Sequence, residues 1–95
     1  MRSSLPTCEL LDKTHAFPCP YMFKVIGKAD RGFSARVIAI VRAELAFETD
    51  PPFRINEAVG GRHVAVTLEP IVQSAHQVLA IYRRLRVLDG LVVLF

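Results

Sequence analysis

The chain has 95 residues, of which 52% are hydrophobic and 22% charged, so it fits one small globular domain rather than a disordered segment. Its net charge of +3 is too small to indicate the concentrated basic surface of a typical nucleic-acid-binding domain. No apolar run approaches the roughly 18 residues that span a bilayer, and residues 1–6 lack the apolar centre of a signal peptide. The two cysteines, Cys8 and Cys19, form neither a disulfide framework nor a zinc motif. We therefore expect a cytoplasmic protein that does not bind membranes.

Residues 1–18 are predicted to form a flexible N-terminal arm, which precedes a single domain over residues 19–95. Pro6 and Pro18 interrupt the arm, and residues 9–13 could form one helical turn at most.

The first regular element is a predicted strand over residues 21–27, which are rich in aromatic and β-branched side chains and end at a glycine. Alternation defines a core face with Tyr21, Phe23 and Val25, and a wetter face with Met22, Lys24, Ile26 and Lys28. A helix is predicted next, over about residues 30–47, because apolar residues recur there at helical spacing. Asp30 is expected to be its N-cap.

A β-hairpin is predicted in the middle of the chain. Residues 53–59 and 63–68 alternate between apolar and polar side chains and are expected to form its two strands. Gly60 and Gly61 are expected to form a two-residue turn, because glycine tolerates a positive φ at both positions.

A second helix and a last strand complete the predicted fold. The helix covers residues 70–86, with Pro70 at its first position, and the strand covers residues 91–95. The order β-α-β-β-α-β predicts a ferredoxin-like α+β sandwich. One four-stranded antiparallel sheet, in the order 4-1-3-2, is then expected to carry both helices on one face.

Residues 17–27 resemble the opening motif of the YbeD-like bacterial family, an uncharacterised group also called UPF0250-type; they read FPCPYMFKVIG. The resemblance continues through residues 82–85 and 88–94. It implies a fold similar to ACT-type regulatory domains and a regulatory rather than enzymatic role. Where the family usually has Tyr and Ser after the hairpin glycine, this chain has His63 and Ala65.

The reactive side chains predict no catalytic or metal site. His15, His63 and His76 fall in three different predicted elements. A pair formed by Cys19 and His63 would lack an orienting residue and an oxyanion site, so we interpret both as unrelated surface residues. Cys8, Cys19 and His15 in a flexible arm lack the framework of a zinc site. We expect no enzymatic activity, cofactor or metal.

The loop after the first strand is a candidate effector site. Its candidate residues are Gly27, Lys28, Asp30, Arg31 and Gly32. The loop is basic and leads into a predicted helix N-terminus, as phosphate-binding loops do, but it lacks the Gly-Lys-Ser/Thr of a P-loop. The alternative is an ordinary strand-to-helix connection. The resemblance to ACT-type domains implies an effector site at a dimer interface here.

Weak RNA or nucleic-acid binding is the alternative function, because RNA-recognition modules share this topology. Those modules stack bases on aromatic residues of the two central strands. The corresponding face of this chain carries Met22, Lys24, Ile26, Lys28, His63, Ala65, Thr67 and Glu69. Only His63 among them could stack on a base, so nucleic acid is the less favoured partner.

Protein association is the preferred function. The candidate association surface consists of Met22, Ile26, Leu91, Val93 and Phe95. Residues 91–95 have no charge although they form a predicted sheet edge, where charges normally prevent pairing. Alternation would place Leu91, Val93 and Phe95 on one face. The alternative is that residues 1–18 of the same chain, rather than a partner, cover this surface. We predict a small non-enzymatic regulatory or adaptor domain that forms a homodimer and binds an unknown protein or small-molecule effector.

Overall fold

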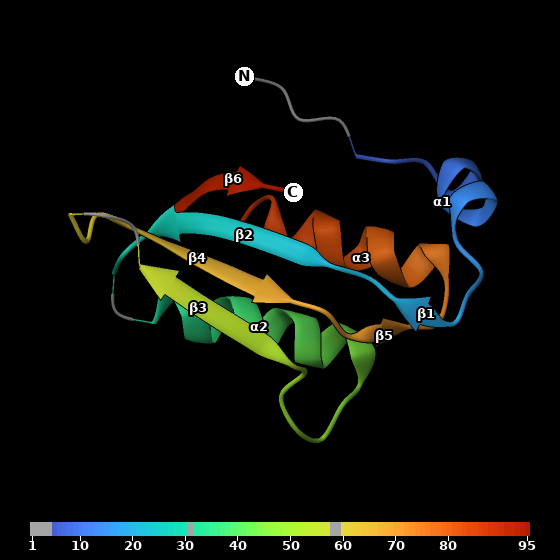
Figure 1. Ribbon diagram of the computed structural model, residues 1–95, viewed down its shortest axis with the longest axis horizontal. Coiled ribbons are helices and arrows are strands. Elements are labelled where there is room, and N and C mark those ends of the chain that lie inside the picture. The colour runs from blue at the N-terminus through green and yellow to red at the C-terminus, as the bar shows by residue number, and fades with distance from the viewer. Residues whose placement is uncertain (1–4, 31, 58–59) are drawn as a thin grey trace.

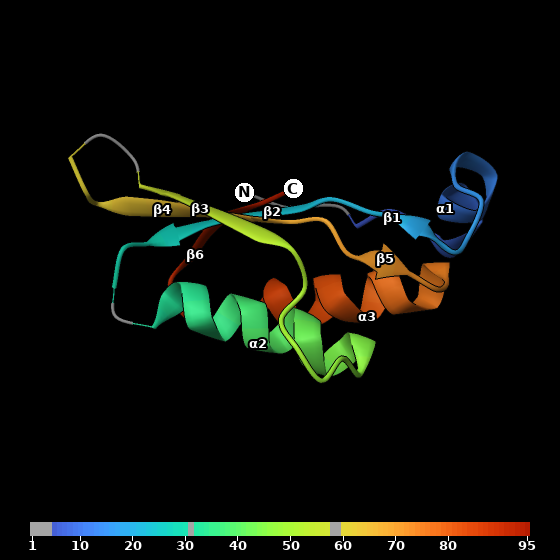
Figure 2. The same cartoon turned by 60° about the horizontal axis from the view of Figure 1, so that its bottom comes forward.

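The computed structural model describes residues 5–30, 32–57 and 60–95 and has two layers, one of strands and one of helices (Figures 1 and 2). The elements are, in chain order, α1 (Cys8–Thr14), β1 (Cys19–Pro20), β2 (Phe23–Lys28), α2 (Phe33–Leu45), β3 (Phe53–Glu57), β4 (His63–Leu68), β5 (Ile71–Val72), α3 (Ala75–Leu85) and β6 (Leu91–Leu94). The mixture of helices and antiparallel strands confirms the predicted α+β class.

Four of the strands form one antiparallel sheet in the order β3-β4-β2-β6, so β3 and β6 are its edges. Figure 2 shows α2 and α3 side by side on one face of this sheet, while no helix of the described residues covers the other face. The short strands β1 and β5 pair with each other beyond the end of the sheet, beside the start of α3 (Figure 1).

The core lies between the sheet and α2 and α3. Phe23 and Val25 are fully buried in β2, whereas Lys24 and Lys28 are exposed, which confirms the predicted alternation. Val64, Val66 and Leu68 of β4 face the same core, as do Val37, Val41, Val78 and Leu85 of the helices. Burial of these apolar side chains is the main source of stability in a domain of this size.

Both main helices begin later than predicted. The N-cap of α2 is Gly32 and not Asp30, whose carboxylate instead contacts Arg36. The N-cap of α3 is Ser74, whose hydroxyl accepts a hydrogen bond from the Gln77 amide. Pro70 therefore does not start the helix, because residues 71–72 pair with β1 as a strand.

The N-terminal segment contains a longer helix than expected. The limit of one turn is wrong, because α1 has seven residues and the Thr7 hydroxyl accepts a hydrogen bond from the Leu10 amide at its start. Leu11 anchors the helix with a side chain only 2% exposed, and α1 packs against α3. Figure 1 places α1 beyond the end of the sheet, beside the start of α3. Residues 1–4 of the predicted arm lie outside the described residues.

The hairpin between β3 and β4 has the predicted centre. Glu57 pairs with Val64, and continuing this register places Gly60 and Gly61 at the middle of the connection. Their φ angles are 90° and 68°, as a turn with positive φ at both positions requires. Ala58 and Val59, the predicted end of the preceding strand, lie outside the described residues.

Candidate functional site

The candidate site is the sheet face that the helices leave uncovered, here called the open face. Its centre is set by the pairing of β2 with β4, in which Lys24 lies opposite Thr67, Ile26 opposite Ala65, and Lys28 opposite His63. These are the residues that alternation placed on this face. Lys24 and Lys28 are exposed, while Ile26, Ala65 and His63 are half-buried.

Residues that lie side by side on neighbouring strands form rows across the open face, and the two edge strands extend these rows. Arg54 of β3 lies opposite Thr67, and Asn56 lies opposite Ala65. On the other side, Val93 of β6 lies opposite Ile26. The Phe95 amide donates a hydrogen bond to the Lys24 carbonyl at 2.9 Å, and the Phe95 ring centroid is 6.0 Å from Lys24 Nζ.

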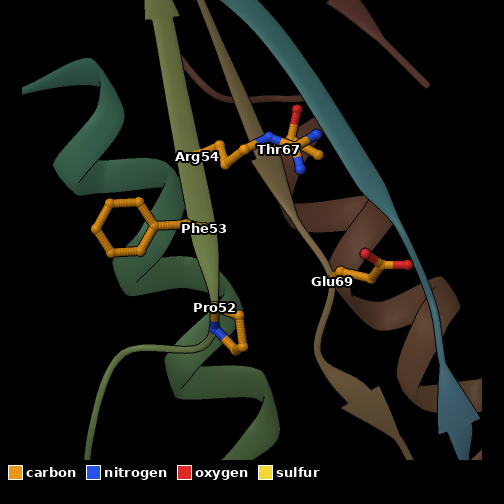
Figure 3. A pocket seen from close by; sticks show the side chains of 5 residues that line it. All are labelled: Pro52, Phe53, Arg54, Thr67 and Glu69. Atoms are coloured by element: carbon orange, nitrogen blue, oxygen red, sulfur yellow. The ribbon is translucent and has the colours of Figure 1, made fainter.

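The open face is shallow. Figure 3 shows its corner beside β3, where the Arg54 side chain reaches across Thr67 and the Phe53 ring points away from the other labelled side chains. The hollow there has a volume of about 110 Å³ and is lined by Pro52, Phe53, Arg54, Thr67 and Glu69. Pockets for drug-sized ligands start at roughly 300 Å³. This face is therefore better suited to a macromolecule than to an enclosed small molecule.

A larger hollow of about 360 Å³ lies on the outer side of α2, lined by Ala35, Ile38, Ala39, Arg42 and Asp50. Its two charged side chains already satisfy each other, because Arg42 Nη1 is 2.7 Å from Asp50 Oδ1. The hollow therefore offers a ligand mainly apolar contacts.

The edge strand β6 contains an irregularity that decides which way its side chains point. Val93 lies opposite Ile26 but Leu91 lies opposite Gly27, so Val92 is an extra residue at a β-bulge. As a result Leu91 and Leu94 both pack against the core. The expectation that Leu91 shares a face with Val93 and Phe95 is wrong, because it assumed regular alternation.

In the predicted effector loop, most of the described backbone groups already contact other parts of the protein. A methyl group added at Gly27 would come within 2.1 Å of the Phe33 ring. The Lys28 amide donates to the Gly90 carbonyl, and the Ala29 amide donates to the Arg62 carbonyl. Packing and strand pairing thus explain this glycine without a ligand. Arg31, which was also a candidate, lies outside the described residues.

Cys19 and His63, considered above as a possible catalytic pair, do not come together in the structure. Cys19 lies in β1, whereas His63 starts β4 at the far end of the sheet (Figure 1). Instead Cys8 Sγ lies 3.6 Å from His76 Nδ1, a contact between α1 and α3 that the sequence spacing did not indicate. Over residues 5–30, 32–57 and 60–95 no three His, Cys, Asp or Glu residues gather as metal ligands.

An aromatic cluster that spacing alone did not reveal joins Tyr21 and Phe23 to Tyr82 of α3. The hydroxyls of Tyr21 and Tyr82 are 3.1 Å apart, and the ring of Phe23 packs against both tyrosines. Burial, together with this hydrogen bond and the nearby Tyr21, raises the pKa of the Tyr82 hydroxyl well above its usual value. The Tyr82 phenol is therefore neutral near pH 7.

The chain matches a family model over residues 12–94, nearly its whole length; the description of that family is "Protein of unknown function (DUF493)". The chain belongs to the DUF493 family. It is similar to a UPF0250 protein of Shewanella woodyi, with 29% identity over 79 residues, which are 83% of this chain and 88% of the relative. UPF0250 proteins of Shewanella amazonensis and Shewanella oneidensis are each 28% identical over the same shares of the two chains. These relatives support the resemblance to the YbeD-like, UPF0250-type family.

The residues of the predicted association surface do not all lie on the same face of this DUF493 chain. Met22, at 54% exposure, precedes β2, and Ile26, Val93 and Phe95 lie in the rows of the open face, whereas Leu91 faces the core. In the described part of the chain no helix is both long and apolar enough to cross a bilayer.

Proposed function

We propose that this DUF493 protein is a small non-enzymatic regulatory or adaptor domain with a ferredoxin-like, ACT-like architecture, and that it associates with a second copy through β6. The observation that carries the proposal is an uncharged edge strand. Leu91–Leu94 contains only Leu and Val and pairs with β2 on one side alone.

The backbone of β6 offers groups for pairing on its outer side. The Phe95 amide donates inward to β2, so alternation directs the preceding amide, that of Leu94, outward. Val92 is 48% exposed and Phe95 is 60% exposed beside this edge. Pairing two β6 strands about a two-fold axis would satisfy the outer backbone groups and cover these side chains.

The opposite edge differs in a way that favours β6. All five residues of β3 are exposed, but Arg54 and Glu57 are charged, and Pro51 and Pro52 precede the strand. Charged side chains and prolines are common means of preventing edge pairing. We therefore expect β6, but not β3, to pair with a strand of another molecule.

Sedimentation equilibrium at micromolar concentration tests the proposal. We expect a dimer for the natural chain and a monomer for Val92→Lys, because lysine at the edge opposes pairing of two like-charged strands. Ile55→Lys is the matched control, since Ile55 is 44% exposed on the other edge strand. A natural chain that is monomeric, or a dimer that Ile55→Lys disrupts and Val92→Lys does not, would refute β6 pairing.

Effector binding at residues 27–32 is the second element of the proposed regulatory role. Its support is the resemblance to ACT-type domains together with the exposed side chains of Lys28 and Asp30. Changes in the amide chemical shifts of residues 27–32 on addition of amino acids or phosphorylated metabolites would support effector binding. Unchanged shifts with both classes of compound would count against it.

A cytoplasmic location is part of the same proposed role.

A further inference from the structure

The open face has an apolar centre with a cation on each side. Along β2, Ile26 lies midway between Lys24 and Lys28, whose side chains share its face. Across the sheet, Ala65 lies on one side of Ile26 and Val93 on the other. Neighbouring strands are about 4.8 Å apart, so this centre is roughly 10 Å wide across the three strands.

Among the described residues, no carboxylate forms an ion pair with the cations of this face. Within the described ranges the ion pairs join Arg36 to Asp30, Arg42 to Asp50, and Arg84 to Glu44. All of these arginines belong to the helices. Lys24, Lys28 and Arg54 on the open face take part in none of the ion pairs of the described residues. Glu69 lines the same hollow as Arg54, yet the two do not form an ion pair.

We propose that the open face binds an amphipathic α-helix of a partner protein, with an apolar stripe flanked on both sides by Asp and Glu. This deepens the proposed adaptor function by naming the class of its partner, and it uses a surface other than the outer edge of β6. Lys24 and Lys28 are four residues apart in a strand, or about 13 Å. An α-helix is about 10–12 Å in diameter, so one crossing β2 fits between them.

In this arrangement each part of the helix meets a complementary group. The apolar stripe covers Ile26 and its neighbours on β4 and β6. Carboxylates on one flank reach Lys24 and Arg54, which lie in the same row of the sheet, and carboxylates on the other flank reach Lys28. Charge complementarity of this kind selects a partner and speeds its association.

The composition of the centre favours a protein over a nucleic acid. Bases bind to sheets by stacking on aromatic side chains at the centre of the face. Here the centre is aliphatic, and the rings that the described residues place on this face, His63 and Phe95, lie in different outer rows.

Two synthetic peptides of identical composition test the inference by fluorescence anisotropy. In the first, Leu residues form one helical stripe with Glu on both flanks. In the second, the same residues are reordered so that the Glu side chains lie opposite the stripe. We expect the first peptide to bind at least about tenfold more tightly, and added salt to weaken its binding.

Variants of the protein locate the binding surface. Lys24→Glu and Lys28→Glu are each expected to weaken binding of the first peptide by about tenfold or more, because each places like charges in contact. Arg83→Glu is the matched control, since it makes the same change of charge at an exposed residue of α3. If a Glu variant loses its native circular dichroism, the Gln variant at the same position replaces it, with a smaller loss expected.

Equal affinity for the two peptides would overturn the inference, as would an equal effect of Arg83→Glu, which would mean that only net charge matters. Binding of a uridine oligonucleotide in place of the first peptide would assign the face to nucleic acid and also overturn it. Sedimentation of Lys24→Glu and Lys28→Glu separates this inference from the dimer: loss of peptide binding with dimerisation retained supports the open face, whereas loss of both would place the peptide at the β6 edge.

Discussion

The ring of Phe33 at the start of α2 packs directly on the backbone of Gly27 in β2. The space between them is so small that a methyl group added at Gly27 would lie 2.1 Å from the ring Cζ. The ring is fully buried, and this contact fixes how closely α2 approaches the sheet. The glycine that ends the predicted first strand therefore has a packing role.

Gly27→Ala is expected to lower the free energy of unfolding by about 2–3 kcal/mol, because the added methyl group overpacks the contact with Phe33. Urea denaturation measures the loss. Gly27→Ala combined with Phe33→Leu serves as the control, since the smaller side chain makes room for the methyl group. The double variant should lose less than the two single losses together, and strict additivity would contradict the contact.

Leu11→Ala tests whether α1 is an integral part of the domain. Its side chain is 2% exposed, so truncation should cost about 2 kcal/mol or more and increase proteolysis within residues 5–14. Leu10→Ala is the control in the same helix, because Leu10 is 53% exposed. Equal protease sensitivity of the two variants and the natural chain would show that α1 contributes nothing to stability.

The buried Tyr82 hydroxyl predicts a loss of stability at alkaline pH. Its pKa is raised in the folded state, so the unfolded chain ionises first, near the ordinary value of 10.0. The contribution of Tyr82 to the free energy of unfolding should therefore be constant below about pH 9. The free energy of unfolding should fall as the pH rises through 10. Denaturation at several alkaline pH values checks this. In Tyr82→Phe the decline should be smaller, and an unchanged decline would exclude Tyr82 as its source.

Cys19→Ala and His63→Ala are expected to leave self-association and any host phenotype unchanged. Cys19 lies in β1, beyond one end of the four-stranded sheet, and His63 begins β4 at the other end, so neither can activate the other. Sedimentation and complementation in the host provide the measurements. Loss of function in both variants, with native circular dichroism, would indicate chemistry that depends on these residues.

Local patterns were sufficient to predict much of the fold. The period-two pattern of residues 21–27 correctly separated the buried Phe23 and Val25 from the exposed Lys24, because one face of an amphipathic strand is always buried. The spacing of apolar residues predicted both long helices, and the glycine pair at 60–61 marked the centre of the hairpin. The residues of the open face on β2 and β4 follow from the same alternation.

Other features depend on contacts between residues that are distant in the sequence. The start of α3 shifted to Ala75 because β5 pairs with β1, about fifty residues earlier in the chain. The bulge at Val92 arises from the register of β6 against β2, and it turns Leu91 towards the core. The docking of α1 on α3 and the contact between Cys8 and His76 likewise appear only after folding. Local sequence sets the period of each element, but register and docking are decided by which buried surfaces fit together, which only the tertiary structure determines.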